Sequence, residues 1–252
     1  MWNDELDCWM QAKLGFLASR EHWPATMSLY QQLRSNELEI LAALGLHFVG
    51  RWPRIRAHTT MMMALVERWD SRYNTFHLPT SEATVTLMDV RRILKIPIRD
   101  VILEYHLDVA DFYLREVCEY ETLPMLDRSR MHLGRAMGIR HIPHVVLVIC
   151  GFFSRRIIPD LKGHGFPVGW RKCLYFMVHD GVQYAWGAAM LAQLYHDMHL
   201  VVYREYASLS VGVTLLHIWA WEHIAVTRPL GVHDRQGRRP YIDRYRDLLH
   251  YT

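Results

Sequence analysis

Four carboxylates are the residues whose chemistry matters most, because two-metal phosphoryl transfer needs several acidic side chains that converge on the metal ions. They are Asp89, Asp160, Asp180 and Glu222. Their spacing gives no indication that they converge. A simpler interpretation places Asp89 in a helix cap and Asp180 at a helix end. We therefore expect no catalytic residue here and keep a nucleic-acid-processing site as the alternative.

Two histidine pairs have a spacing that metal sites use. His196 and His199 lie three positions apart, so in a helix their imidazoles are neighbours on one face. His141 and His144 have the same spacing. No third ligand is evident beside either pair, and the metalloprotease pattern HExxH is absent. The favoured interpretation is a polar helix face, and the sequence predicts no metal.

The sequence contains no clear motif for covalent or cofactor chemistry either. An aminotransferase needs a lysine for the Schiff base with pyridoxal phosphate and a cup for the phosphate. The chain has only Lys13, Lys95, Lys162 and Lys172. The segment KGHGFPVG lacks the Gly-Lys-Ser/Thr ending of a phosphate-binding loop, and no GxSxG elbow occurs. We expect no cofactor and no enzymatic activity.

Two glutamates invite a structural interpretation. Glu222 lies between Trp221 and the apolar Ile224, so it is expected to be partly buried, where a carboxylate is costly unless paired. Arg68 is the expected partner, because its guanidinium can bind a carboxylate with two hydrogen bonds. A ligand pocket at Glu222 is the alternative. Glu82 is expected to organise a turn or to receive an arginine from elsewhere.

The composition favours a globular protein with interfaces. The chain has 252 residues, 51% of them hydrophobic, which is enough for a large core. Its pI of about 8.7 is lower than the pI above about 9 that is usual for domains that grip nucleic acid. Only four of the 29 basic residues are lysine, and arginine favours interfaces. Four cysteines fit no zinc pattern, which suits a reducing compartment.

The elements that must position these residues are mainly helices. Residues 60–69 predict a helix, and two β-prone runs at 75–78 and 83–86, separated by PTSE, predict a small hairpin. Thr86 and Asp89 form a capping box for a helix over residues 87–95. Five residues are expected to pin this region to the helical body: Thr75, Phe76, Leu78, Val85 and Leu87. The hairpin is thus a folding device that can also present Thr80, Ser81 and Glu82 to a partner.

Further helices are predicted on both sides of the hairpin. Asn36 and Glu39 are expected to cap an early helix that Gly45 ends. Other helical patterns cover residues 102–140, 143–151 and 171–180, and the last helix starts at residue 241. The strongest helical pattern is YAWGAAMLAQLYHDMHLVV, whose small residues are expected to let the helix over residues 209–226 approach closely. The latter contains His217, Glu222 and His223, which predicts a buried helix and no membrane span.

Three segments together resemble the plant mobile domain family, which includes the MAINTENANCE OF MERISTEMS-like proteins. They are ALVERWDSRYNTFHLPTSEATVTLMDVRRILKIPI, YAWGAAMLAQLYHDM and LLHIWAWEHIAVTRP. Their order and spacing also fit, and the resemblance covers residue 38 to the C-terminus. Three positions depart from the usual residue: Ser81 and Lys95 stand where glycine is common, and His223 stands where arginine is common.

The resemblance implies a fold and a class of function. It implies a mainly α, multi-helix single globular domain with one small β-hairpin, over residues 37–252, after a helical extension at 1–36. The chain stops before a further aromatic-Pro motif, so we expect a shortened C-terminal end. Members are transposon-derived nuclear proteins, sometimes labelled aminotransferase-like, that support transposon silencing, genome integrity and meristem maintenance without an established catalytic activity. The resemblance implies a soluble nuclear protein whose partners are a phosphatase-like protein of the seven class, other plant mobile domain proteins and chromatin.

Two sets of residues are the candidate sites. The motif residues, expected to serve structure or a partner, are Glu67, Arg68, Trp69, Phe76, His77, Pro79, Glu82, Asp89, Tyr184, Trp186, Gly187, Trp219, Trp221 and Glu222. The arginines that are candidates for nucleic-acid contacts are Arg91, Arg92, Arg155, Arg156, Arg235, Arg238 and Arg239.

Overall fold

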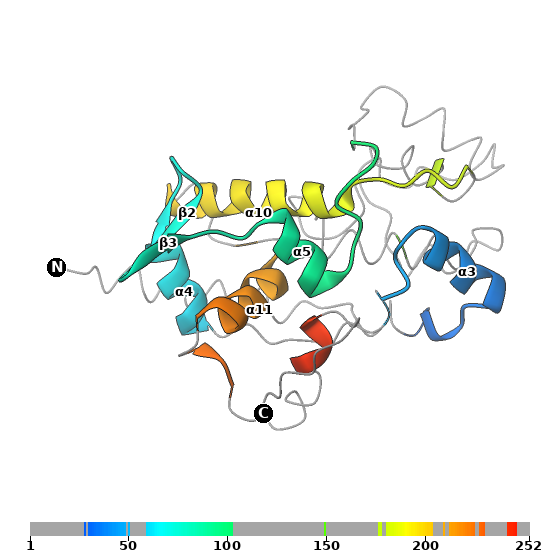
Figure 1. Ribbon diagram of the computed structural model, residues 1–252, viewed down its shortest axis with the longest axis horizontal. Coiled ribbons are helices and arrows are strands. Elements are labelled where there is room, and N and C mark those ends of the chain that lie inside the picture. The colour runs from blue at the N-terminus through cyan, green and yellow to red at the C-terminus, as the bar shows by residue number, and fades with distance from the viewer. Residues whose placement is uncertain are drawn as a thin grey trace, which may run out of the picture. The chain divides into compact units, whose positions relative to one another are not determined.

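The computed structural model describes residues 28, 30–48, 50, 59–102, 149, 176–177, 180–203, 209, 212–224, 227–229 and 241–245. The chain divides into two compact units. The first contains residues 1–21, 51–95 and 190–252, and the second contains residues 22–50 and 96–189. Helix predominates among the described residues, beside one small sheet, which agrees with the predicted mainly α class (Figure 1).

The sheet of the first unit has three antiparallel strands in the order β1-β2-β3. These are β1 (Trp69–Asp70), β2 (Thr75–Leu78) and β3 (Ser81–Ala83). The predicted hairpin is confirmed, but its second strand begins earlier than predicted, because only Pro79 and Thr80 form the turn. Strand β1 was not predicted. Helix α4 (Thr59–Glu67) ends before Trp69, which pairs with Phe76 in the sheet instead of continuing the helix.

Helix α5 (Leu87–Leu94) starts with the predicted capping box. The Thr86 hydroxyl accepts a hydrogen bond from the Asp89 N–H (3.2 Å), and the Asp89 carboxylate accepts one from the Thr86 N–H (2.9 Å). Together these bonds satisfy two donors that a helix start leaves open. The helix ends at Lys95, whose φ of 59° lies in the left-handed region. The lysine therefore adopts a conformation that glycine adopts at lower cost.

The remaining helices of the first unit differ from the predicted ones in their bounds and contacts. Helix α11 (Val213–His223) starts later than predicted, because Gly212 has a φ of 74° and interrupts the helical backbone. The backbone at Gly212 lies close to α10 (Trp186–Val202), since a Cβ on Gly212 would lie 3.0 Å from Leu194. The small residue Ala192 is exposed and does not face α11 as expected. The last element, η4 (Tyr241–Tyr245), is a short 3-10 helix.

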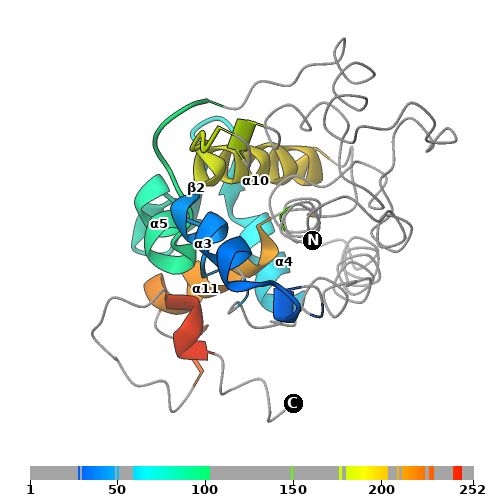
Figure 2. The same cartoon turned by 90° about the vertical axis from the view of Figure 1, so that its right-hand side faces the viewer.

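The packing of the first unit centres on α11. Helices α4 and α5 both contact α11, and η4 contacts α5. Figures 1 and 2 both show α11 between α5 and α4, with η4 beneath it. The helix buries most of its length, from Thr214 to Ala220. The predicted helix around Trp219 is therefore a core element, and among the described residues no helix is long and apolar enough to cross a bilayer.

The second unit contains α3 (Ser35–Ala43) and the chain on both sides of Tyr184. The cap of α3 differs from the prediction: Arg34 is the N-cap, and its N–H donates to the Glu37 carboxylate (3.0 Å), so Asn36 and Glu39 do not cap. Gly45 ends the helix as predicted. With its φ of 71° it donates to the Ala42 carbonyl, and the next N–H returns to the Leu41 carbonyl.

Several predicted segments lie largely or wholly outside the described residues. They include the helical patterns over 102–140 and 143–151, the segment KGHGFPVG and most of the pattern at 171–180. Within them only single positions are described, and Ile149, Phe176 and Met177 are helical.

Candidate functional site

An aromatic cluster fixes the hairpin to the helices of the first unit. The Phe76 ring lies 4.8 Å from that of Trp69 and 5.1 Å from that of Trp219, measured between centroids. Trp69 also contacts Tyr195 of α10 at 5.5 Å. Phe76 and Trp219 are fully buried, and such pairs add about 0.5–1.5 kcal/mol beyond burial. Within the part of the chain that the structure describes, the indole N–H groups of Trp69 and Trp219 have no hydrogen-bond partner, so packing holds these rings.

Tyr195 extends this attachment to the chain between β3 and α5. Its hydroxyl donates to the Val85 carbonyl and lies 3.1 Å from the Thr84 hydroxyl. The Thr84 hydroxyl in turn donates to the carbonyl of Asn74 (2.6 Å), whose φ of 54° closes the β1–β2 turn. One tyrosine thus links α10 to both ends of the hairpin.

Asp89 joins the start of α5 to the end of α11. Its carboxylate accepts hydrogen bonds from the Thr86 hydroxyl (2.7 Å) and from Nε2 of His223 (3.2 Å). Burial acts to raise the pKa of the Asp89 carboxyl, but the bonds from His223 and Thr86 outweigh burial and hold that pKa below its ordinary value. Asp89 is therefore a structural residue, as the capping interpretation predicted.

Glu222 has a different partner from the predicted one. Its side chain is largely buried, and it accepts a hydrogen bond from the Tyr245 hydroxyl (2.7 Å). Arg228 lies 3.8 Å from the same carboxylate and donates to the carbonyls of Trp221 and Glu222 at the end of α11. The prediction of Arg68 was wrong, because Arg68, the residue after α4, donates instead to the Ala64 carbonyl of that helix (2.9 Å).

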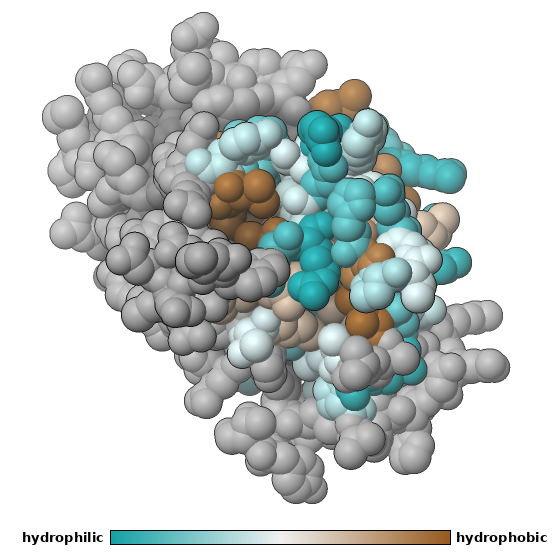
Figure 3. All heavy atoms as spheres, turned by 90° about the vertical axis from the view of Figure 1, so that its left-hand side faces the viewer, coloured by the Kyte–Doolittle hydropathy of each residue, from teal (hydrophilic) through white to brown (hydrophobic). Residues whose placement is uncertain are grey.

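The outer face of the hairpin carries charged and polar groups that form their own pairs. Arg72 donates to Asp70 from Nη2 (2.9 Å), Nε and the backbone, and these bonds hold the pKa of the Asp70 carboxyl well below its usual range. His77 lies between Asp70 (3.3 Å) and Glu82 (3.5 Å). Glu82 therefore pairs across the strands with a histidine rather than with an arginine. Figure 3 shows mostly hydrophilic side chains over this end of the unit.

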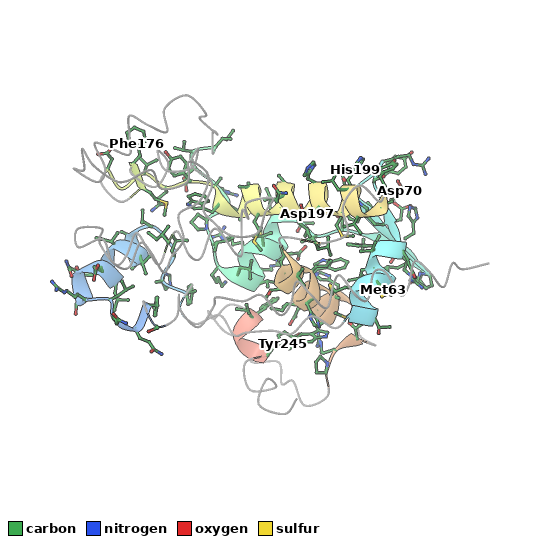
Figure 4. All side chains as sticks on the ribbon, turned by 180° about the vertical axis from the view of Figure 1, so that it is seen from behind. Met63, Asp70, Phe176, Asp197, His199 and Tyr245 are labelled. Carbon is green, nitrogen blue, oxygen red and sulfur yellow. The ribbon has the colours of Figure 1, made fainter. Side chains whose placement is uncertain are left out.

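Two exposed tyrosines flank this charged group. Tyr73 is 69% exposed and has the Arg72 guanidinium 5.7 Å from its ring centroid. Tyr203, 56% exposed, lies 3.3 Å from the Ser71 hydroxyl and contacts the ring of His199. Figure 4 shows His199 at the end of α10 that lies beside Asp70.

The motif residues of the second unit have structural contacts. The Trp186 indole N–H points to the Met177 sulfur (3.2 Å), and the Gly187 N–H donates to the Pro97 carbonyl (2.7 Å). Tyr184 forms an isolated bridge with Val101. These three residues thus attach the start of α10 to residues 97–101.

The candidate chemical residues do not assemble a site in the described part of the chain. Asp89 and Glu222 occupy the two separate pairs given above. His196 and His199 are both exposed on α10, whereas Asp197 between them is buried and accepts from Gln193 (2.7 Å). No group of three His, Cys, Asp or Glu among the described residues is placed to hold a metal. Asp160, His141 and His144 lie outside the described residues.

The remaining motif residues of the first unit are exposed or half-buried. Glu67, Arg68 and Pro79 are exposed, and Trp221 is half-buried against Tyr245, with ring centroids 4.5 Å apart. Arg91 and Arg92 are exposed on α5. The other candidate arginines, Arg155, Arg156, Arg235, Arg238 and Arg239, lie outside the described residues.

Sequence reasoning missed the long-range partners. His223, Tyr245 and Tyr195 complete the contacts of Asp89, Glu222 and the hairpin, and each is between 23 and 134 positions from its partner. No spacing rule connects positions so far apart. The one indication in the sequence was His223, which stands where arginine is common. It pointed to position 223 but did not predict that Asp89 is its partner.

Comparison with known proteins gives one family. The family model of the plant mobile domain matches residues 47–250. Protein MAIN-LIKE 2 of Arabidopsis thaliana is 27% identical over 96% of this chain and 37% of its own length. A Serine/threonine-protein phosphatase 7 long form homolog from the same plant is 25% identical over 91% of this chain and 17% of its own length. Protein MAINTENANCE OF MERISTEMS, also from Arabidopsis thaliana, is 24% identical over 79% of this chain and 44% of its own length. The chain thus spans less than half of each of these relatives. No solved structure matches it significantly.

Proposed function

The chain belongs to the plant mobile domain family, and from this premise we propose that it is a non-enzymatic interaction module that acts in the nucleus. The match over residues 47–250 carries the proposal, together with relatives named MAIN-LIKE 2 and MAINTENANCE OF MERISTEMS. The module would contribute to transposon silencing, genome integrity and meristem maintenance by binding other proteins.

The partner we propose is a phosphatase-like protein of the seven class or another plant mobile domain protein. The support is that a region of a protein named phosphatase 7 long form homolog is similar to 91% of this chain. Only 17% of that protein is covered, so the similar region is one segment of a longer chain. Because a protein with this phosphatase name contains a similar domain, we infer that a phosphatase-like protein is a partner of this chain.

A second candidate is a DNA-binding or nucleic-acid-processing role derived from a transposon. The observation that favours it is the pair of exposed arginines, Arg91 and Arg92, on α5. Binding through phosphate contacts loses affinity steeply as salt rises. A shallow salt dependence, and no heat on titration with Mg²⁺ or Mn²⁺, would remove this candidate.

The experiment that tests the leading proposal is affinity capture from plant nuclei on the immobilised chain. We expect enrichment of a phosphatase-like or plant mobile domain protein over a bait unfolded by Phe76→Ala and Trp219→Ala. If the folded and unfolded baits retain the same proteins, the proposal is wrong.

A further inference from the structure

Helix α5 has an outward surface of unusual composition. Leu87, Met88, Arg91 and Arg92 are all exposed, so the prediction that Leu87 pins this region to the helical body was wrong, and we name these four residues the α5 ridge. Because side chains three and four positions apart are neighbours on a helix, Leu87 lies beside Arg91, and Met88 lies beside both arginines. In Figure 2, α5 lies at the outer left of the first unit, with α11 and α4 to its right. The ridge is therefore one continuous surface.

The opposite side of the same helix is fully used by the fold. Asp89, Val90, Ile93 and Leu94 are buried, and α11 and η4 both contact α5. The contrast means that the exposure of Leu87 (39%) and Met88 (45%) is not a consequence of a loosely packed helix. These two apolar side chains remain in water although the helix is firmly held.

The two arginines of the ridge are uncompensated. Neither guanidinium has a hydrogen bond or an ion pair within the part of the chain that the structure describes, whereas Arg72 is bound to Asp70 and Arg228 to the end of α11. Both arginines lie in the last turn of α5, where positive charge interacts favourably with the helix dipole. This interaction explains the positive charge but not the adjacent Leu87 and Met88. The free charges are available to a carboxylate.

The mixture of side chains selects the class of partner. Protein interfaces are enriched in Met and Arg, and methionine adapts its shape to apolar partners. Arginine binds carboxylates with two parallel hydrogen bonds. A surface for phosphates alone gains nothing from exposed Leu87 and Met88. The outer face of the hairpin is a weaker candidate, because Asp70 already neutralises Arg72.

We propose that the α5 ridge is a docking surface for an acidic amphipathic segment of a partner protein. Apolar side chains of the segment contact Leu87 and Met88, and its carboxylates pair with Arg91 and Arg92. This inference rests on the proposed function as an interaction module, since it assigns a surface and a partner chemistry to that role.

The test is fluorescence anisotropy of a labelled helical peptide of about 20 residues, built from Leu and Glu, added to the full chain. We expect R91E/R92E to weaken binding about tenfold or more and Met88→Ser about threefold. Arg99→Glu, which alters an exposed arginine outside α5, is the matched control and should have no effect. A peptide with Lys in place of Glu should not bind. Circular dichroism of each variant, and the neutral R91Q/R92Q, separate lost binding from lost folding.

Three results of the binding measurements would overturn the inference. They are no binding of the acidic peptide, equal binding to R91E/R92E, and binding of duplex DNA that R91E/R92E abolishes while Met88→Ser does not. If the ridge variants still capture the same nuclear proteins as the unaltered chain, the ridge is wrong but the interaction module stands. If the unaltered chain captures none, the proposed function itself fails.

Discussion

The inner and outer faces of residues 69–94 differ in what their side chains contact. The inner face packs Trp69 and Phe76 against α10 and α11 and binds Asp89 to His223. The outer face exposes Tyr73, Met88 and Arg91 to solvent. The motif by which the family is recognised thus serves chiefly to build the fold, and several residues between the motif positions remain exposed.

The largest effect is expected at the centre of the inner face. Phe76→Ala should lower the free energy of unfolding by about 3–5 kcal/mol, because it removes a fully buried ring that contacts two tryptophans. Tyr73→Ala, on the same hairpin but exposed, should change it by less than about 0.5 kcal/mol. Denaturant unfolding measures both, and comparable losses would show that the two faces are not distinct.

The next effect concerns the partner of Glu222. Tyr245→Phe should cost about 1.5–3 kcal/mol, because it removes a hydrogen bond to a largely buried carboxylate. Arg68→Ala should cost little, since among the described residues the Arg68 side chain pairs only with the Ala64 carbonyl and Glu67 of α4. The opposite order of losses in thermal unfolding would restore Arg68 as the partner.

A smaller effect follows from the helix cap. Removing the Asp89 carboxylate with Asp89→Asn should cost about 1 kcal/mol near neutral pH. Since the folded pKa of Asp89 is lowered, its contribution is present above the unfolded pKa of about 4 and is lost as pH falls through the lower folded value. The unaltered protein should therefore lose its stability advantage over the Asn variant in acid. A constant difference between the two unfolding curves from neutral to acid pH would contradict this assignment.

The smallest effect has the opposite sign. Lys95→Gly should stabilise the protein by up to about 1 kcal/mol, because glycine adopts the left-handed backbone at Lys95 without steric cost. Lys95→Ala keeps the cost and is the control. Equal unfolding midpoints for the two variants would mean that this backbone conformation carries no strain.

Local features of the fold were predictable because their causes are local. The Thr86–Asp89 box, the Gly45 helix end and the hairpin each depend on residues a few positions apart. Three boundaries were misplaced where strand pairing, a positive φ or a tight turn outweighs the pattern. Trp69 leaves its helix to pair with Phe76, Gly212 delays α11, and Pro79-Thr80 shortens the turn.

The candidate site was less predictable, since its partners come from distant parts of the chain. Nothing near Asp89 points to His223, and nothing near Glu222 points to Tyr245. The same limit applies to the α5 ridge. The arginines were identified by their charge, but the burial of Val90 and Ile93 shows which side of α5 is exposed.

One side of α5 maintains the fold, and the residues of its other side are exposed. The most direct measurement is the free energy of unfolding of two glutamine variants, Val90→Gln and R91Q/R92Q. Val90 is fully buried, so Val90→Gln should cost about 3 kcal/mol or more, whereas R91Q/R92Q should cost less than about 1 kcal/mol, the share owed to the helix dipole. Equal costs, or a larger cost at the arginines, would contradict the account.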